Sequence, residues 1–220
     1  MSPFRGIFVV VFVSMMMPGC DCNTHNHDQA ISITTLEKDT AGLPTMNEEM
    51  KKALEREFLS FQFSLNDTDY RKHLQFYDQR MFRYEGLQLD TVAIKYKKQY
   101  NLGQSFEVKN VMVNKISPMV EDSGFYWSTL RVYIKMDIKY EEKYPGDPKG
   151  LLGIVRDNFG QNVEYDSLSR AFRVDDNFVF YAVTPVDSVD FHFLKGSYFR
   201  VAELSKLAQF KTIATLKRYE

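Results

Sequence analysis

The sequence has only two cysteines, at positions 20 and 22, and a single tryptophan. Because both cysteines lie near the amino terminus, the rest of the chain has no disulfide framework of the kind that stabilises small secreted domains. The chain also lacks an excess of either charge, with 28 lysines and arginines against 29 aspartates and glutamates. Nucleic-acid-binding domains are usually strongly basic, so we expect no nucleic-acid partner.

Motifs that identify common enzyme and cofactor sites are also missing. The sequence contains no G-x-S-x-G nucleophile motif, no glycine-rich phosphate loop, no haem attachment motif and no EF-hand loop. No cysteine outside the amino-terminal pair is present to act as a nucleophile. The sequence therefore predicts no cofactor, and no motif in it identifies an enzyme.

A short apolar run lies close to the start of the chain. It extends from Ile7 to Met17, is interrupted only by Ser14, follows the single basic residue Arg5, and is ended by Pro18 and Gly19. A membrane-spanning helix needs roughly 20 apolar residues, and this run is shorter. Its length is typical of the apolar region of a secretory signal peptide.

The residues Met17-Pro18-Gly19-Cys20 resemble the lipobox of bacterial lipoproteins. Gly19 and Cys20 match that motif, whereas Met17 and Pro18 differ from its usual Leu and Ala or Ser. The resemblance implies cleavage before Cys20, attachment of lipid to its thiol, and a location on a bacterial membrane facing the periplasm or the cell surface. Several acyl chains would anchor the protein stably, because each buried CH₂ contributes about 0.8 kcal/mol. The alternative is ordinary secretion with a free Cys20.

Residues 20–45 have the composition of a hydrophilic tether, rich in Asn, Asp and Thr and without an apolar period. Their cysteines and the histidines at 25 and 27 resemble a metal site in composition. The spacing matches no familiar zinc pattern, and a lipidated Cys20 has no thiolate to offer, so we expect no metal there. We therefore expect a signal peptide at 1–19, a lipidated tether at 20–45 and one folded domain at 46–220.

The first part of this domain has helical periodicity. A capping-box pattern at Thr45-Met46-Asn47-Glu48 predicts a first helix that continues to Leu65. A second helix is expected from the caps at 66–69 to Gly86, and a third from Asp90 to about 101–103. His73 lies one position away from the apolar stripe of the second helix, so we expect it to be exposed.

The pattern then changes to the alternation of β-strands. A strand at 106–113 has a phase slip at Lys109-Asn110 that indicates a bulge. The clearest strand runs from Tyr126 to Tyr140, with apolar residues on one face and polar residues on the other. At about 3.3 Å per residue it would extend about 50 Å, so we expect it to be twisted or bent.

The carboxy-terminal part is predicted to be a mixture of short elements. We expect a helix at 151–159, a weak strand at 162–165, a hairpin whose strands at 170–174 and 178–183 are joined by Asp175-Asp176-Asn177, a strand at 189–194, a helix at 201–209 and a final strand at 211–217.

Helices followed by antiparallel strands indicate an α+β domain, with three amino-terminal helices packed on a curved antiparallel sheet. This order of elements, over about residues 46–195, resembles the cone of the nuclear-transport-factor-2-like superfamily, which includes the ketosteroid isomerases. The resemblance implies a pocket between the sheet and the helices. It rests on the order of elements, and no position matches a motif from which catalytic residues could be transferred.

Weak candidates for ligand binding are Trp127, Tyr133, Tyr165 and His192, chosen by residue type. The candidates by residue type for an isomerase-like acid and base are Asp137, Tyr133, Tyr165 and His192. Because Asp137 and Tyr133 lie on the polar face of the long strand, the alternative for them is solvation or pairing with Arg131, Lys135 or Lys139. Trp127 and nearby tyrosines could bind carbohydrate, although aromatic residues at such spacings usually pack in cores.

The function that we expect is a non-enzymatic, membrane-anchored binding domain for a small ligand or another envelope protein. The alternatives are an isomerase- or dehydratase-like enzyme on the same fold, and a structural or assembly lipoprotein. An internal pocket lined by converging Asp, Tyr or His side chains would favour the enzyme. A large exposed apolar patch would favour a protein partner.

Overall fold

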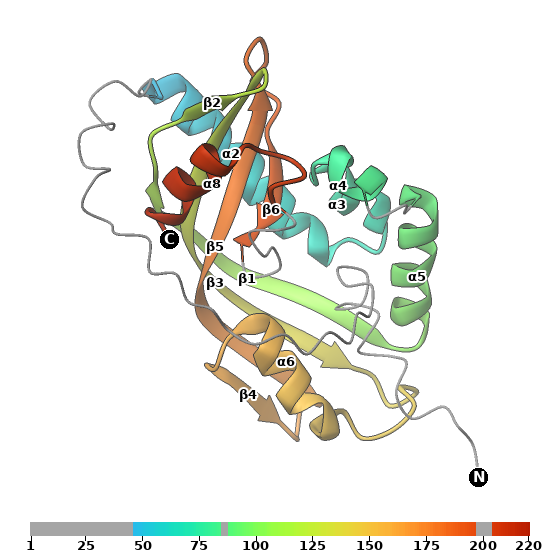
Figure 1. Ribbon diagram of the computed structural model, residues 1–220. Coiled ribbons are helices and arrows are strands. Elements are labelled where there is room, and N and C mark those ends of the chain that lie inside the picture. Colours follow the sequence, from blue (N-terminus) through green and yellow to red (C-terminus); the bar gives the residue numbers. More distant parts are fainter. Residues whose placement is uncertain (1–45, 85–87, 197–203) are drawn as a thin grey trace, which may run out of the picture.

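The computed structural model describes residues 46–84, 88–196 and 204–220. Amino-terminal helices pack against a six-stranded antiparallel sheet, so the predicted α+β class is confirmed (Figure 1). The helical part comprises α2 (Glu48–Phe63), the short 3₁₀ helix η3 (Ser64–Asn66), α3 (Tyr70–Gln75), α4 (Gln79–Tyr84) and α5 (Leu89–Asn101). The strands are β1 (Gln104–Ile116), β2 (Val120–Asp122), β3 (Phe125–Tyr140), β4 (Val163–Asp166), β5 (Ala171–Pro185) and β6 (His192–Lys195).

The starts of the helices differ in detail from the sequence prediction. The cap of α2 is Asn47, whose side chain accepts a hydrogen bond from the Met50 amide at 2.8 Å, and the predicted cap Thr45 lies outside the described residues. Helix α5 begins after Gln88, which places Asp90 in its first turn. A carboxylate there interacts favourably with the helix dipole.

The predicted second helix is two helices, α3 and α4. The chain leaves helical geometry near Tyr77, where the Phe193 amide donates to the Phe76 carbonyl at 2.7 Å. Tyr77 and Phe193 form an isolated parallel bridge. The break therefore leaves a carbonyl free to accept a hydrogen bond from the open edge of β6. In an unbroken helix that carbonyl would bond within the helix.

The two long strands β3 and β5 form the middle of the sheet. β1 and β2 share one edge of β3, and β4 and β6 share the far edge of β5. The predicted bulge is present in β1 between Val108 and Asn110. In β3 the apolar residues from Leu130 to Tyr140 are buried on the face covered by α2, as the alternation predicts.

The predicted hairpin at 170–183 is wrong, because β5 is one continuous strand. Asp175, Asp176 and Asn177 pair in regular register with β3, and Asp175 forms an ion pair with Lys135 at 3.8 Å. The real turn lies between β4 and β5. There the Asp166 side chain accepts from the amides of Leu168 and Ser169, and Arg170 has a φ of 48°.

Helix α6 (Leu152–Phe159), preceded by the 3₁₀ helix η4 (Pro148–Leu151), agrees with the prediction. It ends at Gly160, whose φ of 90° suits glycine. A Cβ at that position would contact the Asp176 carboxylate, so a larger residue would require that side chain to move as well as strain the backbone.

The last segment was predicted to be a strand and is helix α8 (Phe210–Lys217). Its buried residues Ile213 and Leu216 are three apart, which is helical spacing. Figure 1 shows α8 in front of the sheet and α2 behind it. The Thr129 hydroxyl of β3 donates to the Leu216 carbonyl at 3.0 Å, which fixes α8 to the face opposite α2. Of the helix predicted at 201–209, residues 201–203 lie outside the described part, and 205–208 form turns and a bend.

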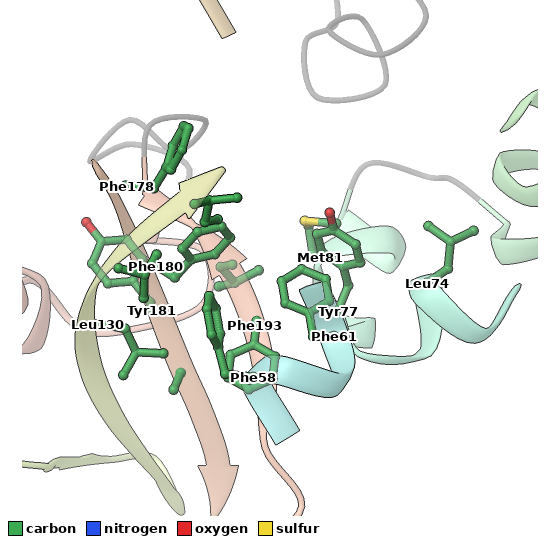
Figure 2. Close-up of a cluster of buried hydrophobic side chains, with 14 of the residues drawn as sticks. Phe58, Phe61, Leu74, Tyr77, Met81, Leu130, Phe178, Phe180, Tyr181 and Phe193 are labelled. Carbon is green, nitrogen blue, oxygen red and sulfur yellow. The ribbon is translucent and has the colours of Figure 1, made fainter. Parts of the chain in front are cut away.

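An aromatic cluster joins the helices to the sheet. Figure 2 shows Phe58 and Phe61 of α2 between the strands and the side chains of Tyr77 and Met81. The Phe193 ring lies 5.2 Å from the rings of both Phe58 and Phe61, and the Phe58 and Phe180 rings are 5.0 Å apart. Edge-to-face and stacked pairs of this kind contribute beyond the area that they bury.

Candidate functional site

A small, partly open cavity lies between the helices and the sheet. Its volume is about 40 Å³, which is room for about three water molecules. Most of its wall is apolar and includes the rings of Phe61, Phe106, Phe159, Phe178 and Phe180. Four residues with polar side chains also line it: Gln62, His73, Tyr77 and Lys195. An apolar space with a few converging polar groups is typical of small-molecule sites.

Lys195 is the most unusual residue of this lining. It ends β6 opposite Phe180, so its side chain points to the helix-covered face of the sheet. The side chain is buried, and its Nζ donates to the Asn158 carbonyl at 2.8 Å. The same Nζ lies 4.4 Å and 4.6 Å from the ring centres of Phe159 and Phe178. These contacts hold the amine at the wall of the cavity.

The charge state of Lys195 follows from this environment. Removal from water penalises an ammonium, and burial lowers the pKa of Lys195 to about 7. The aromatic rings offset part of this penalty, because their faces attract a cation. A pKa this far below the usual value of about 10.4 is rare for lysine.

His73 faces the same cavity from α3, and its predicted exposure is wrong, since the residue is 1% exposed. Its ring stacks on Phe61 at 4.8 Å. Nδ1 is 3.1 Å from the Phe61 carbonyl and 2.8 Å from Ser64 Oγ, which itself donates to that carbonyl. Because a carbonyl can only accept, Nδ1 carries the hydrogen.

The tautomer of His73 determines the role of Tyr77. Burial lowers the pKa of His73 to about 3, against the opposing effect of the hydrogen bond to Phe61, so the ring is neutral at physiological pH. With the hydrogen on Nδ1, Nε2 can only accept, and the Tyr77 hydroxyl at 3.3 Å is its donor. His73 therefore orients Tyr77 and is not itself a proton donor toward the cavity.

None of the four ligand-binding candidates chosen from the sequence lines this cavity. Trp127 is 1% exposed, so its ring offers no platform to a sugar, and its Nε1 is buried without a hydrogen-bond partner among the described residues. His192 is half-buried on the face opposite Phe193, and its Nδ1 has no hydrogen-bond partner in that part of the chain either. Tyr165 packs beside Phe172 at 5.0 Å between ring centres.

Tyr133 and Asp137 lie on the face of β3 opposite the cavity. A hydrogen bond to Asp175 raises the pKa of Tyr133, which has a structural partner in that carboxylate. Asp137 is buried and pairs with Lys109 of β1 at 2.5 Å, instead of the lysines and arginine of its own strand that were predicted. The structure therefore does not bring this proposed acid and base to the cavity. Cys20 lies outside the described residues.

The sequence contained signals for the residues that were missed. Tyr70, His73, Leu74 and Tyr77 have the i, i+3, i+4, i+7 spacing of one helix face, which places His73 on the buried stripe. Alternation along β6 likewise puts Lys195 on the face of Phe193. The prediction for His73 failed because the residue was placed one position away from that stripe, and the strand predicted at 189–194 ended before Lys195.

The sequence matches no protein-family model and no curated protein. A functional assignment must therefore come from the chemistry of the cavity.

Proposed function

We propose that this chain is a lipid-anchored protein of the bacterial envelope whose folded domain binds a small ligand in the cavity between the helices and the sheet. The observation that supports this is the apolar, ring-lined space into which Lys195, Tyr77 and Gln62 bring polar groups. The small volume limits the enclosed part of the ligand to a few non-hydrogen atoms. A group with a hydrogen-bond acceptor would suit the Lys195 amine.

The position of the cavity agrees with the cone of the nuclear-transport-factor-2-like superfamily, and we include that likeness in the proposal. Its support is the order of the elements and the way in which α2 and α3 enclose the cavity against β3, β5 and β6. Fold alone does not imply a ligand or a reaction.

A ligand is favoured over a protein partner because the exposed apolar side chains are dispersed. The eight large hydrophobic residues that are exposed in the described part lie on α2, α5, β1, α8 and two loops. Only Leu59 and Phe63 form a pair on one helix, at 36% and 42% exposure. Single exposed apolar residues are normal on soluble surfaces.

The lipid anchor is tested by metabolic labelling with palmitate. The wild-type protein is expected to incorporate label and Cys20→Ser is expected to incorporate none, because the cysteine thiol is the acyl acceptor. Cys22→Ser is the matched control and should label like wild type. Equal labelling of wild type and Cys20→Ser would contradict the anchor. Within the described residues, no helix combines the length and hydropathy needed to cross a membrane.

Ligand binding is tested with propionamide, a small probe that has both an acceptor and a donor. Saturation-transfer NMR is expected to detect binding to the wild type and a loss of at least tenfold in affinity for Leu65→Phe, whose larger ring would fill the cavity that Leu65 lines. Leu59→Phe, on the exposed side of α2, should bind like wild type. No signal with the wild type, or equal binding by both variants, would refute a ligand site here.

A second candidate function is catalysis, as in the isomerase-like alternative. It is favoured by the meeting of His73, Tyr77 and Lys195 at one cavity. In this arrangement the basic group is an amine, since Asp137 lies on the opposite face of β3. Such a site suits carbonyl chemistry that uses a lysine.

A further inference from the structure

The carboxamide of Gln62 is a buried polar group in the cavity wall. The residue is 3% exposed, and its side chain forms no hydrogen bond with any other described residue. We propose that Gln62 selects the ligand, which is a small uncharged molecule whose enclosed end is a carboxamide. This inference rests on the proposed ligand site and names the class of ligand that the site would take.

The first support is the face of α2 that carries Gln62. The buried residues of this helix have the i, i+4, i+7, i+8 spacing of one helix face: Leu54, Phe58, Phe61 and Gln62. That face packs on the sheet, where the Phe58 ring lies 5.0 Å from the ring of Phe180 and 5.2 Å from that of Phe193. Gln62 therefore meets the cavity from a helix that is fixed to the sheet by aromatic contacts.

The second support is that the other polar side chains of the lining are already engaged. Nδ1 of His73 donates to the Phe61 carbonyl, and Nε2 accepts from the Tyr77 hydroxyl. The Lys195 amine donates to a backbone carbonyl of α6 at 2.8 Å. These bonds are made without a ligand, whereas the bonding capacity of Gln62 is left for one to complete.

The polar atoms of Gln62 can also be reached. Two other polar atoms without a partner in the described ranges, Gln99 Oε1 and Trp127 Nε1, are sealed from any molecule as large as water. The carboxamide atoms of Gln62 are not sealed in this way, although the residue as a whole is buried. Because Gln62 lines the cavity, a molecule in that space can contact its carboxamide.

The chemistry of this side chain defines the class of ligand. Gln62 presents one acceptor, Oε1, and two N–H donors on Nε2. A second carboxamide places a donor beside an acceptor, so it can form two hydrogen bonds with Gln62 at once. A carboxylate or a ketone has no donor for Oε1 and would leave that acceptor unsatisfied in apolar surroundings. The phenylalanine rings of the wall also favour an uncharged ligand, because an ion would lose its hydration there.

Propionamide and butanone together test this selection. The two molecules have the same number of non-hydrogen atoms and nearly the same shape, but butanone has a methyl group in place of the amide NH₂. Their affinities for the full-length protein in detergent are measured at pH 7 by saturation-transfer NMR titration. Wild type is expected to bind propionamide at least tenfold more tightly than butanone, because only propionamide supplies a donor to Oε1 of Gln62.

Gln62→Met tests whether this preference comes from Gln62. Methionine has a similar length and no amide, so the variant is expected to lose at least tenfold in affinity for propionamide and to retain its affinity for butanone. Its urea midpoint without ligand should be no lower than that of wild type, since no hydrogen bond to the described part of the chain is removed. Gln75→Met, at an exposed position of α3, is the matched control and should keep the wild-type preference.

The outcomes separate selection by Gln62 from the ligand site itself. If wild type binds propionamide no more tightly than butanone, or if Gln62→Met keeps the wild-type preference, selection by Gln62 is rejected and the ligand site stands. A lower urea midpoint for Gln62→Met would show that the side chain stabilises the fold, and would also reject the selective role. The comparison of the two probes on wild type remains decisive if the variant does not fold. Binding of neither probe by wild type would reject both the selection and the ligand site.

Discussion

Acidification from pH 6.5 toward pH 3 is expected to destabilise the protein by up to about 5 kcal/mol through His73 alone. The pKa of His73 is about 3 in the folded state, against 6.5 for the unperturbed ring. Between pH 6.5 and pH 3 the unfolded state binds a proton on His73 and the folded state does not. The free energy of unfolding therefore decreases as the pH is lowered across that window. The shift of about 3.5 units corresponds to about 5 kcal/mol at 1.36 kcal/mol per unit.

The interval between pH 6 and pH 5 isolates this effect. The carboxylates whose pKa is lowered in the fold, such as Glu107, begin to matter only near their unfolded values of 4.5 and below. Lys195 affects the pH dependence of stability only above about pH 7, because its side chain is protonated in both the folded and the unfolded state below its folded pKa. Between pH 6 and 5 the free energy of unfolding should therefore fall by about 1 kcal/mol per pH unit because of His73.

Urea unfolding at several pH values measures this slope. His73→Gln should be nearly flat between pH 6 and 5, since Gln can still donate to the Phe61 carbonyl but does not titrate. Gln75→Ala, at an exposed position on α3 that does not titrate, should keep the wild-type slope. If His73→Gln and wild type have the same slope, the acid sensitivity has another origin.

The sequence predicted an element correctly where the residues of that element alone determine its conformation. In β3 the burial alternates from Leu130 to Met136, because one face meets the amino-terminal helices and the other meets water over much of that stretch. The bulge of β1 was also visible as a slip in that alternation. Where one face of a strand packs on the core and the other meets water, the alternation of apolar and polar residues is sufficient to identify the strand.

The errors arose where tertiary contacts replace local preference. Asp175-Asp176-Asn177 has the composition of a turn, but Lys135 and Tyr133 of β3 supply partners for its side chains, so the strand continues. Pairing with a neighbouring strand outweighs a propensity worth at most about 1 kcal/mol. The same applies to α3 and α4, which are separated because the Phe193 amide at the edge of β6 donates a hydrogen bond to the Phe76 carbonyl between them.

The cavity could not be predicted as a unit, because its polar lining comes from distant parts of the chain. Gln62 and His73 belong to the amino-terminal helices, and Lys195 to the last strand. Their meeting depends on β6 pairing with β5 beneath α2, which no local pattern specifies. Periodicity could have placed each side chain on a buried face, but only the topology brings them to one cavity.

Phe193→Ala is expected to destabilise the fold by about 3 to 5 kcal/mol, the usual loss for a buried phenylalanine. Phe193 is 0% exposed and lies 5.2 Å from the rings of both Phe58 and Phe61. Removing its ring leaves a void between β6 and α2, where Figure 2 shows Phe193 beside Phe58. The lost aromatic contacts would add to the cost of the void.

Urea unfolding at pH 7 measures this loss, with Phe210→Ala as the matched control. Phe210 is 60% exposed on α8, so the same truncation there should change the free energy of unfolding by less than about 0.5 kcal/mol. Similar losses in the two variants would mean that Phe193 does not join the helices to the sheet. A large loss only at Phe193 would place the main stabilising contact next to the cavity, since the neighbouring Phe61 ring also forms part of the cavity wall. The packing that stabilises the fold would then be the same packing that shapes the ligand site.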